Sequence, residues 1–217
     1  MARVKGVSKN PEQARRKIVA SALKAFAKHG YSAASTEQIA EDAGYSQATV
    51  FFHFKTKVGL LKACFDEVQK SLQGMSLDPG QIGVLEFVKQ LDHLFDDLVI
   101  TNFFVRLMME DKKNKASRSL YMAYRDQIHN RLRAEIVNET GVPPEEAMQV
   151  AGAIVCMSLG VHVSNTIEAK PFNRSEYSAM ILKSTQLLVD DLHRQQLLKK
   201  QPAKIGTRKP LKSGQTL

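Results

Sequence analysis

The segment Ser35–Lys57, STEQIAEDAGYSQATVFFHFKTK, constrains the fold of this 217-residue chain more than any other part of it. Its apolar spacing predicts two short helices, at about 36–43 and 47–54. Gly44 lies between them, where a residue without a Cβ can adopt the left-handed conformation that ends many helices. Two short helices joined by so tight a turn are typical of a helix-turn-helix, in which the second helix can enter the major groove of DNA.

The rest of the chain also shows helical spacing and no sustained strand alternation, which predicts an all-α protein. Ser35, Ser46 and Thr56 are placed to cap helices, because their hydroxyls can accept hydrogen bonds from free backbone amides. Further helices are predicted at about 11–29, 56–72, 82–98, 102–109, 117–139, 144–169 and 173–200.

These helices suggest two domains that meet near residue 75, where proline and glycine accumulate. Residues 12–72 form a three-helix unit, with the helix-turn-helix at about 35–54, and a fourth helix joins it to the next domain. Residues 76–200 form a second helical domain. The Pro/Gly/Lys-rich segment 201–217 is expected to be a basic, disordered tail.

The net charge of +9 is concentrated at the two ends of the chain. Residues 1–28 carry eight Lys or Arg and one acidic residue, and residues 193–217 carry seven and none. Cationic ends on a mildly acidic body fit contact with a polyanion. The residues that could add backbone or minor-groove contacts are Arg3, Lys5, Lys9, Arg15, Arg16 and Lys17.

Residue chemistry at the start of the second short helix favours DNA as that polyanion. Gln47 could pair with N6 and N7 of adenine, and the Thr49 methyl group could contact a thymine methyl, both from exposed positions. Ala48 is small and allows close approach of the helix to the groove. Thr36 and Ser46 could donate hydrogen bonds to phosphates, which position a protein on DNA without selecting its sequence.

The same residues carry a family resemblance. Residues 12–72 resemble the N-terminal domain of the tetracycline-repressor (TetR) family of bacterial transcriptional regulators. The matching positions are Thr36, Ile39, Ala40, Ala43, Gly44, Ser46, Thr49, Val50, His53, Phe54, Lys57 and Leu60. The resemblance implies that His53 and Lys57 anchor phosphates.

The aromatic residues of the second short helix divide between surface and core. Phe51 stands where the family usually has a tyrosine whose hydroxyl binds phosphate. That contact is lost here, although the ring can still pack against sugars or base methyl groups. We expect Phe52 to be exposed near the DNA, and Val50 and Phe54 to belong to the core.

The resemblance implies a cytoplasmic, homodimeric regulator, more often a repressor, that binds a palindromic operator and is released by a small effector. In the family, the last two long helices pair with those of a second copy, and here 144–169 and 173–200 carry the small and aliphatic residues that such packing needs. No cofactor and no enzymatic activity are expected. An architectural, weakly sequence-specific DNA-binding protein without an effector remains the alternative.

The resemblance also implies an effector pocket within the second domain. The low polar content of the candidate residues favours a hydrophobic effector. Each of them could instead be an ordinary core residue, since aromatic stripes at helical spacing usually are. The candidates are Phe87, Phe95, Phe103, Phe104, Met108, Tyr121, Tyr124, Met157 and His162.

Other chemistries are disfavoured. Residues 44–48 half-match a nucleophile elbow, but no strand or base partner accompanies them. The segment DHLFDD at 92–97 has the i, i+4 spacing of metal ligands, although such spacing more often marks a solvated face.

Cys64 and Cys156 are expected to be buried thiols in a reducing cytoplasm. No apolar run reaches the roughly 18 residues that a membrane span requires, so no membrane partner is expected.

Overall fold

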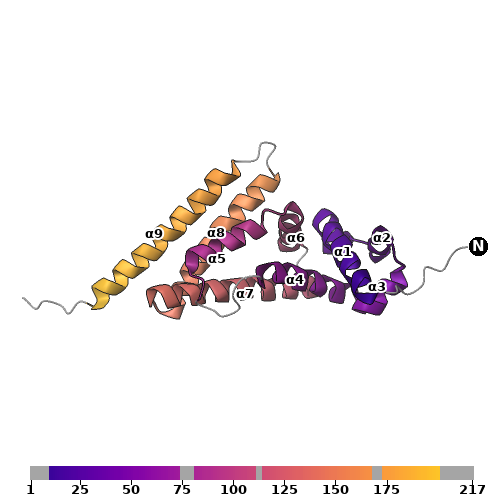
Figure 1. The fold of residues 1–217 in the computed structure, drawn as a ribbon, viewed down its shortest axis with the longest axis horizontal. Helices are drawn as coiled ribbons and strands as arrows, with labels where there is room; N and C mark the ends of the chain where they lie inside the picture. The colour runs from indigo at the N-terminus through magenta and orange to yellow at the C-terminus, as the bar shows by residue number, and fades with distance from the viewer. Residues whose placement is uncertain (1–9, 74–80, 111–113, 168–172, 201–217) are drawn as a thin grey trace, which may run out of the picture.

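The computed structural model describes residues 10–73, 81–110, 114–167 and 173–200. Within these residues every regular element is a helix, which confirms the all-α prediction. The helices are α1 (Pro11–Ala33), α2 (Thr36–Asp42), α3 (Gln47–Phe54), α4 (Lys57–Gln73), α5 (Val84–Leu94), α6 (Leu98–Met109), α7 (Lys115–Thr140), α8 (Pro144–Ile167) and α9 (Arg174–Lys200). Figure 1 shows α1, α2 and α3 gathered at one end of an elongated molecule, with α9 reaching the other.

The first helix begins at the predicted residue and breaks at the predicted glycine. The Asn10 side chain caps α1 by accepting a hydrogen bond of 3.1 Å from the Gln13 amide. Gly30 has φ 78° and ψ 166°, a conformation that interrupts the helix. One more helical turn follows, and α1 therefore ends at Ala33 rather than near His29.

The prediction of helices at 82–98 and 102–109 was wrong in its boundaries. α5 ends at Leu94, and α6 already begins at Leu98. Asp97 explains the difference, because its Oδ1 accepts a hydrogen bond of 2.7 Å from the Val99 amide and so caps a new helix. The predicted domain boundary near residue 75 and the predicted tail at 201–217 lie outside the described residues.

One hydrophobic core connects the N-terminal helices with the rest of the molecule. Phe26 on α1 contacts Phe103 on α6, with ring centroids 6.5 Å apart. Phe103 also contacts Phe65 on α4 at 5.2 Å. At the end of α6, the Glu110 carboxylate accepts hydrogen bonds from the amides of Tyr31 (3.0 Å) and Ser32 (2.9 Å). The position of α1 is therefore tied to both α4 and α6.

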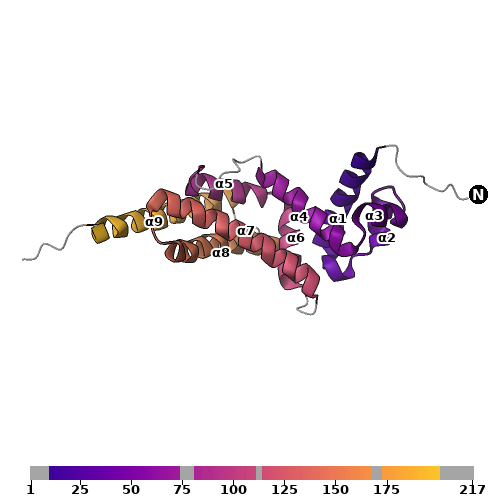
Figure 2. The same cartoon turned by 90° about the horizontal axis from the view of Figure 1, so that it is seen from below.

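The N-terminus of α5 is capped by α7 instead of by its own neighbouring residues. Gly83 precedes α5 and has no side chain to offer. Glu135 on α7 accepts from the Gly83 amide at 3.2 Å, and Glu139 accepts from the Val84 amide at 2.9 Å. Figure 2 shows α7 running along α8, so that α7 links α5 to the C-terminal helices.

Candidate DNA-binding interface

The turn between α2 and α3 is built by two serine caps and one glycine. The Ser35 hydroxyl accepts from the amides of Glu37 (3.2 Å) and Gln38 (3.4 Å), and the Ser46 hydroxyl accepts from the Thr49 amide at 3.2 Å. Gly44 adopts φ 81° at the turn itself. The predicted helix starts and the predicted glycine turn are thus present, and α3 spans the predicted residues 47–54.

The inner face of this unit holds α3 rigidly. Ile39, Ala40, Val50 and Phe54 are all buried in the hydrophobic core, as predicted for Val50 and Phe54. In addition, the Ser21 hydroxyl donates a hydrogen bond of 3.0 Å to the Ile39 carbonyl, which joins α1 to α2. The exposed face of α3 therefore has a fixed direction relative to α1.

The exposed face of α3 carries most of the predicted contact residues. Gln47 and Ala48 are exposed, Phe51 is 39% exposed and Phe52 is 60% exposed. The predicted exposure of Phe52 is confirmed. The predicted exposure of Thr49 is wrong, because this residue is only 8% exposed.

The burial of Thr49 has a local cause. Its hydroxyl lies 2.9 Å from the Ser46 hydroxyl, and its amide donates to the same oxygen. Both hydroxyls are thus engaged in contacts at the start of α3. Gln47, by contrast, reaches back across the turn and donates from Nε2 to the Thr36 hydroxyl at 2.9 Å.

Positive charge surrounds the C-terminal end of α3. Lys55 has φ 64°, and its amine donates to the Phe52 carbonyl at 3.0 Å while lying 5.4 Å from the centre of the Phe52 ring. The Arg15 guanidinium lies 5.5 Å from the centre of the Phe54 ring. Burial, together with the charges of Arg15 and Lys55, lowers the pKa of His53 below its usual value. Lys55 was not among the contact residues predicted from the sequence. The one indication there was a cation directly after α3.

The predicted phosphate anchor Lys57 points toward α1. Its amine donates to the Ser32 carbonyl at 3.1 Å and lies 4.8 Å from the centre of the Tyr31 ring. Burial lowers the pKa of Lys57, and the negative charge of Glu110 opposes that effect. In this conformation Lys57 joins α4 to the end of α1. The two amides that donate hydrogen bonds to Glu110 lie beside this contact.

Four of the predicted effector residues line one small cavity. Phe95, Phe104, Tyr121 and Tyr124 line a cavity of about 40 Å³. Its remaining lining residues are Leu91, Arg125, Ile128, Val155 and Leu159. The Phe104 ring stacks on the Tyr124 ring, with centroids 5.0 Å apart, and meets the Phe95 ring edge-on, with centroids 5.7 Å apart. These four residues form the part of the predicted set that the fold brings together.

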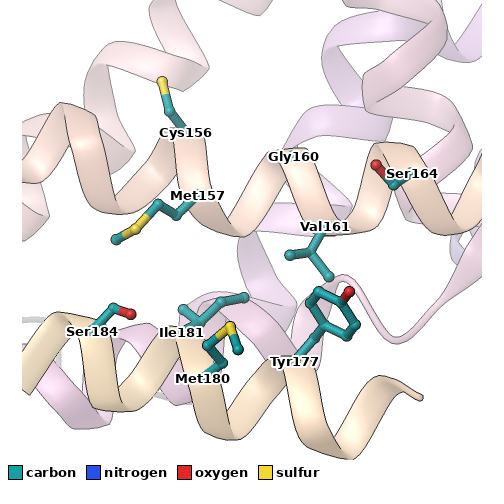
Figure 3. Close-up of a pocket in the computed structure, with 9 residues that line it drawn as sticks. All are labelled: Cys156, Met157, Gly160, Val161, Ser164, Tyr177, Met180, Ile181 and Ser184. Carbon is teal, nitrogen blue, oxygen red and sulfur yellow. The ribbon is translucent and has the colours of Figure 1, made fainter. Parts of the chain in front are cut away.

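The other predicted pocket residues lie elsewhere. Phe87 and Phe103 are buried in the hydrophobic core, where the Phe103 ring lies 5.5 Å from that of Phe104, and Met108 is 40% exposed. Met157 lines a separate hollow of about 340 Å³ between α8 and α9, together with Val161, Tyr177, Met180 and Ile181 (Figure 3).

His162 is a buried core histidine that joins three helices. Its Nε2 lies 3.0 Å from the Asp92 carboxylate on α5, and the Ser178 hydroxyl on α9 donates to the same carboxylate. The neighbouring acidic residues have structural partners as well, since Asp96 pairs with His93 at 2.8 Å. The described residues contain no group of three or more His, Cys, Asp or Glu side chains arranged to hold a metal ion.

Two further sequence predictions concern α4 and α8. Cys64 is buried as predicted, and burial raises the pKa of its thiol. Cys156 was predicted to be buried, but this cysteine on α8 is exposed. Within the described residues, Pro144–Ser164 is long and apolar enough to cross a membrane by length and composition alone, and 28% of its most apolar window is buried.

Comparison with known proteins agrees with this geometry. Residues 18–64 match the family described as bacterial regulatory proteins, tetR family. The chain is 40% identical over 52 residues to the uncharacterized HTH-type transcriptional regulator YvkB of Bacillus subtilis (strain 168), covering 24% of this chain and 28% of that protein. It is 28% identical over 97 residues to the HTH-type transcriptional repressor Rv1474c of Mycobacterium tuberculosis (strain ATCC 25618 / H37Rv), covering 45% and 52%. The matched regions thus span at most about half the length of these curated relatives.

Solved structures extend the likeness beyond the first four helices. A tetR-family transcriptional regulator from Streptomyces coelicolor superposes with a TM-score of 0.63 at 19% identity, covering 92% of each chain. A protein from Saccharomonospora viridis in complex with choline gives 0.61 at 19% identity, covering 81% of this chain and 96% of that one. At such identities the likeness concerns the fold. Residues 18–64 therefore form a domain of the tetR family of bacterial regulatory proteins, and the remaining helices share the fold of solved TetR-family regulators.

Proposed function

We propose that this protein is a transcriptional repressor that binds a palindromic operator in the cytoplasm as a homodimer and releases it when a small effector binds. The observation that carries the proposal is the exposed face of α3. Gln47, Ala48 and Phe51 project from a helix whose opposite face is locked into the core. A glutamine can read adenine in the major groove, and a neighbouring alanine permits close approach.

A second copy of the chain is the proposed partner of α8 and α9. A single recognition helix reads few bases, so two helices about one DNA turn apart are needed for a specific palindromic site. α9 exposes large apolar side chains, with Met180 at the edge of the hollow beside α8 at 62% and Leu187 at 61%. Gly152 and Gly160 have nothing within 4 Å of an added Cβ, which leaves room for a close helix contact. A matching copy would cover this surface.

An effector would act on the aromatic cavity lined by Phe95, Phe104, Tyr121 and Tyr124. The cavity of about 40 Å³ is close to the volume of one water molecule, so binding would have to move the surrounding rings. The Tyr124 hydroxyl is buried and has no hydrogen-bond partner among the described residues. A mostly apolar effector with one acceptor would satisfy it. The structural relative from Saccharomonospora viridis was solved with choline, which supports a small-molecule site in this fold.

Movement of these rings would reach the DNA-binding helices through α6. Phe104 lies on α6, and at the end of that helix Glu110 accepts hydrogen bonds from the amides of Tyr31 and Ser32. A shift of α6 would change the orientation of α1 and therefore the spacing of the two recognition helices in a dimer. An effector that prefers the shifted state by about 1–3 kcal/mol would give the coupling typical of ligand-controlled proteins.

The proposal is tested by selecting bound sequences from random DNA and then measuring affinity for the selected site against competitor DNA. We expect a palindromic site and a preference of roughly 10³-fold or more over random DNA at physiological salt. An architectural protein without an effector would instead bind all sequences with similar affinity. A preference below about tenfold would therefore favour that alternative over the repressor.

Two substitutions separate base reading from phosphate contact. Gln47→Ala should relax the preference at one base pair of each half-site and cost about 1–3 kcal/mol on the best sequence. Lys57→Ala should weaken binding to all sequences alike and reduce the salt dependence. If both variants lost affinity uniformly, the proposed division of roles would be wrong.

A further inference from the structure

The contact between Gln47 and Thr36 crosses the turn of the helix-turn-helix. The Gln47 amide nitrogen donates to the Thr36 hydroxyl oxygen at 2.9 Å, although the residues are 11 positions apart in the chain. Each residue is the first of its helix, α3 and α2 respectively. Gln47 is exposed, whereas Thr36 is half-buried and therefore better fixed. The hydrogen bond therefore attaches the exposed side chain of Gln47 to the more buried side chain of Thr36.

Neighbouring polar side chains are engaged in other contacts. The hydroxyls of Ser46 and Thr49 lie 2.9 Å apart and serve the start of α3. Gln38, the other exposed glutamine of this unit, turns its amide nitrogen toward Asp42 at 2.9 Å on its own helix. Thr36 is thus the side chain to which the fold ties Gln47.

The hydrogen-bonding capacity of the two groups suits a bound base. An amide nitrogen carries two hydrogens, so one can bond Thr36 while the other, together with Oε1, remains for an adenine. Bidentate recognition of adenine N6 and N7 uses just these two atoms. Thr36 accepts the bond from Gln47, and its own hydroxyl hydrogen can be donated to a nearby phosphate oxygen. A base, Gln47, Thr36 and a phosphate could thus be linked by a continuous series of hydrogen bonds.

We propose that Thr36 is a positioning residue for base recognition, which holds the Gln47 amide in the orientation that reads adenine. This inference rests on the proposed function, because it assumes sequence-specific binding through α3. A glutamine side chain has three rotatable torsions, and ordering it at the interface lowers affinity. Holding it in place before DNA arrives reduces that loss for the correct base, and thereby sharpens the preference.

The test compares Thr36→Val, which keeps the shape and removes the hydroxyl, with Thr36→Ser, which keeps the hydroxyl. Gln47→Ala first identifies the base pair that Gln47 reads. At that base pair, Thr36→Val should reduce the preference for the selected base by roughly 2- to 10-fold, the factor that corresponds to one neutral hydrogen bond. Thr36→Ser should retain the preference. Gln38→Ala is the matched control and should leave it unchanged.

The double variant Thr36→Val, Gln47→Ala should show no further loss of preference at this base pair beyond that of Gln47→Ala alone. Thr36→Ala serves as a second variant, and thermal unfolding of each checks that the fold is intact. The inference is overturned if Thr36→Val and Thr36→Ala weaken binding to all sequences equally, since Thr36 would then contact only phosphate. A wild-type protein with no sequence preference would instead overturn the proposed function itself.

Discussion

Glu135→Ala should destabilise this protein more than removal of a typical surface charge. Glu135 is fully buried on α7, where its carboxylate accepts from the Arg131 guanidinium at 3.0 Å and from the Gly83 amide at 3.2 Å. The substitution would leave an arginine whose side chain is 18% exposed without this acceptor. It would also remove a cap from α5, whose preceding residue, Gly83, cannot supply one.

The magnitude follows from these two losses. Removing one partner of a buried ion pair costs about 3–5 kcal/mol where the remaining charge stays buried, and the partly exposed Arg131 favours the lower end of that range. The cap contributes about 1 kcal/mol, part of which is already contained in that range. For a chain of this size, a loss of about 3–5 kcal/mol corresponds to a decrease in Tm of roughly 6–20 °C.

The measurement is urea unfolding followed by far-UV circular dichroism, at one fixed protomer concentration because dimerisation contributes to stability. Glu12→Ala is the matched control, since Glu12 and Arg16 form a pair with the same i, i+4 spacing in which both side chains are well exposed. Loss of such a pair costs about 0.3–0.5 kcal/mol. A cost of less than about 1 kcal/mol for Glu135→Ala would refute the claim that this buried carboxylate holds Arg131 and the start of α5 in place.

The remaining predictions concern the junction, the interface and the dimer. Glu110→Gln should lower stability by about 1–2 kcal/mol in thermal unfolding, because a neutral amide replaces the charged acceptor of two backbone amides; an unchanged Tm would contradict this. Because burial lowers the pKa of His53, the free protein resists its protonation, whereas a DNA phosphate favours it. Affinity should therefore rise as the pH falls below the usual histidine range, and His53→Gln should abolish that slope; equal slopes in both proteins would exclude the phosphate contact. Met180→Glu should shift sedimentation toward a monomer, and an undisturbed dimer would place the interface elsewhere.

The sequence alone was sufficient to predict the helix-turn-helix, because the determinants of this unit are local. Ser35, Ser46 and Gly44 act on backbone groups within a few residues of themselves, and their effects do not depend on the rest of the fold. The burial of Val50 and Phe54 also follows from helical periodicity within α3. The prediction from the sequence put Thr49 on the exposed side of α3, whereas in the structure it is buried and its hydroxyl lies 2.9 Å from that of Ser46.

The tertiary structure decided which distant residues meet. Four of the predicted aromatic residues surround one cavity while Met157 lines another, a division set by the packing of α5, α6, α7 and α8. In the sequence, Glu135 cannot be told apart from the other charged residues of its helix. In the structure it is buried, because the start of α5 packs against it and the Gly83 amide donates a hydrogen bond to it. Likewise, Gln47 meets Thr36, and Glu110 meets Tyr31 across 79 positions, only after the helices have docked. Caps and turns depend on neighbouring residues and can be read along the chain. Cavities, buried charges and the contacts that orient side chains depend on how whole helices pack, and one-dimensional spacing does not contain that information.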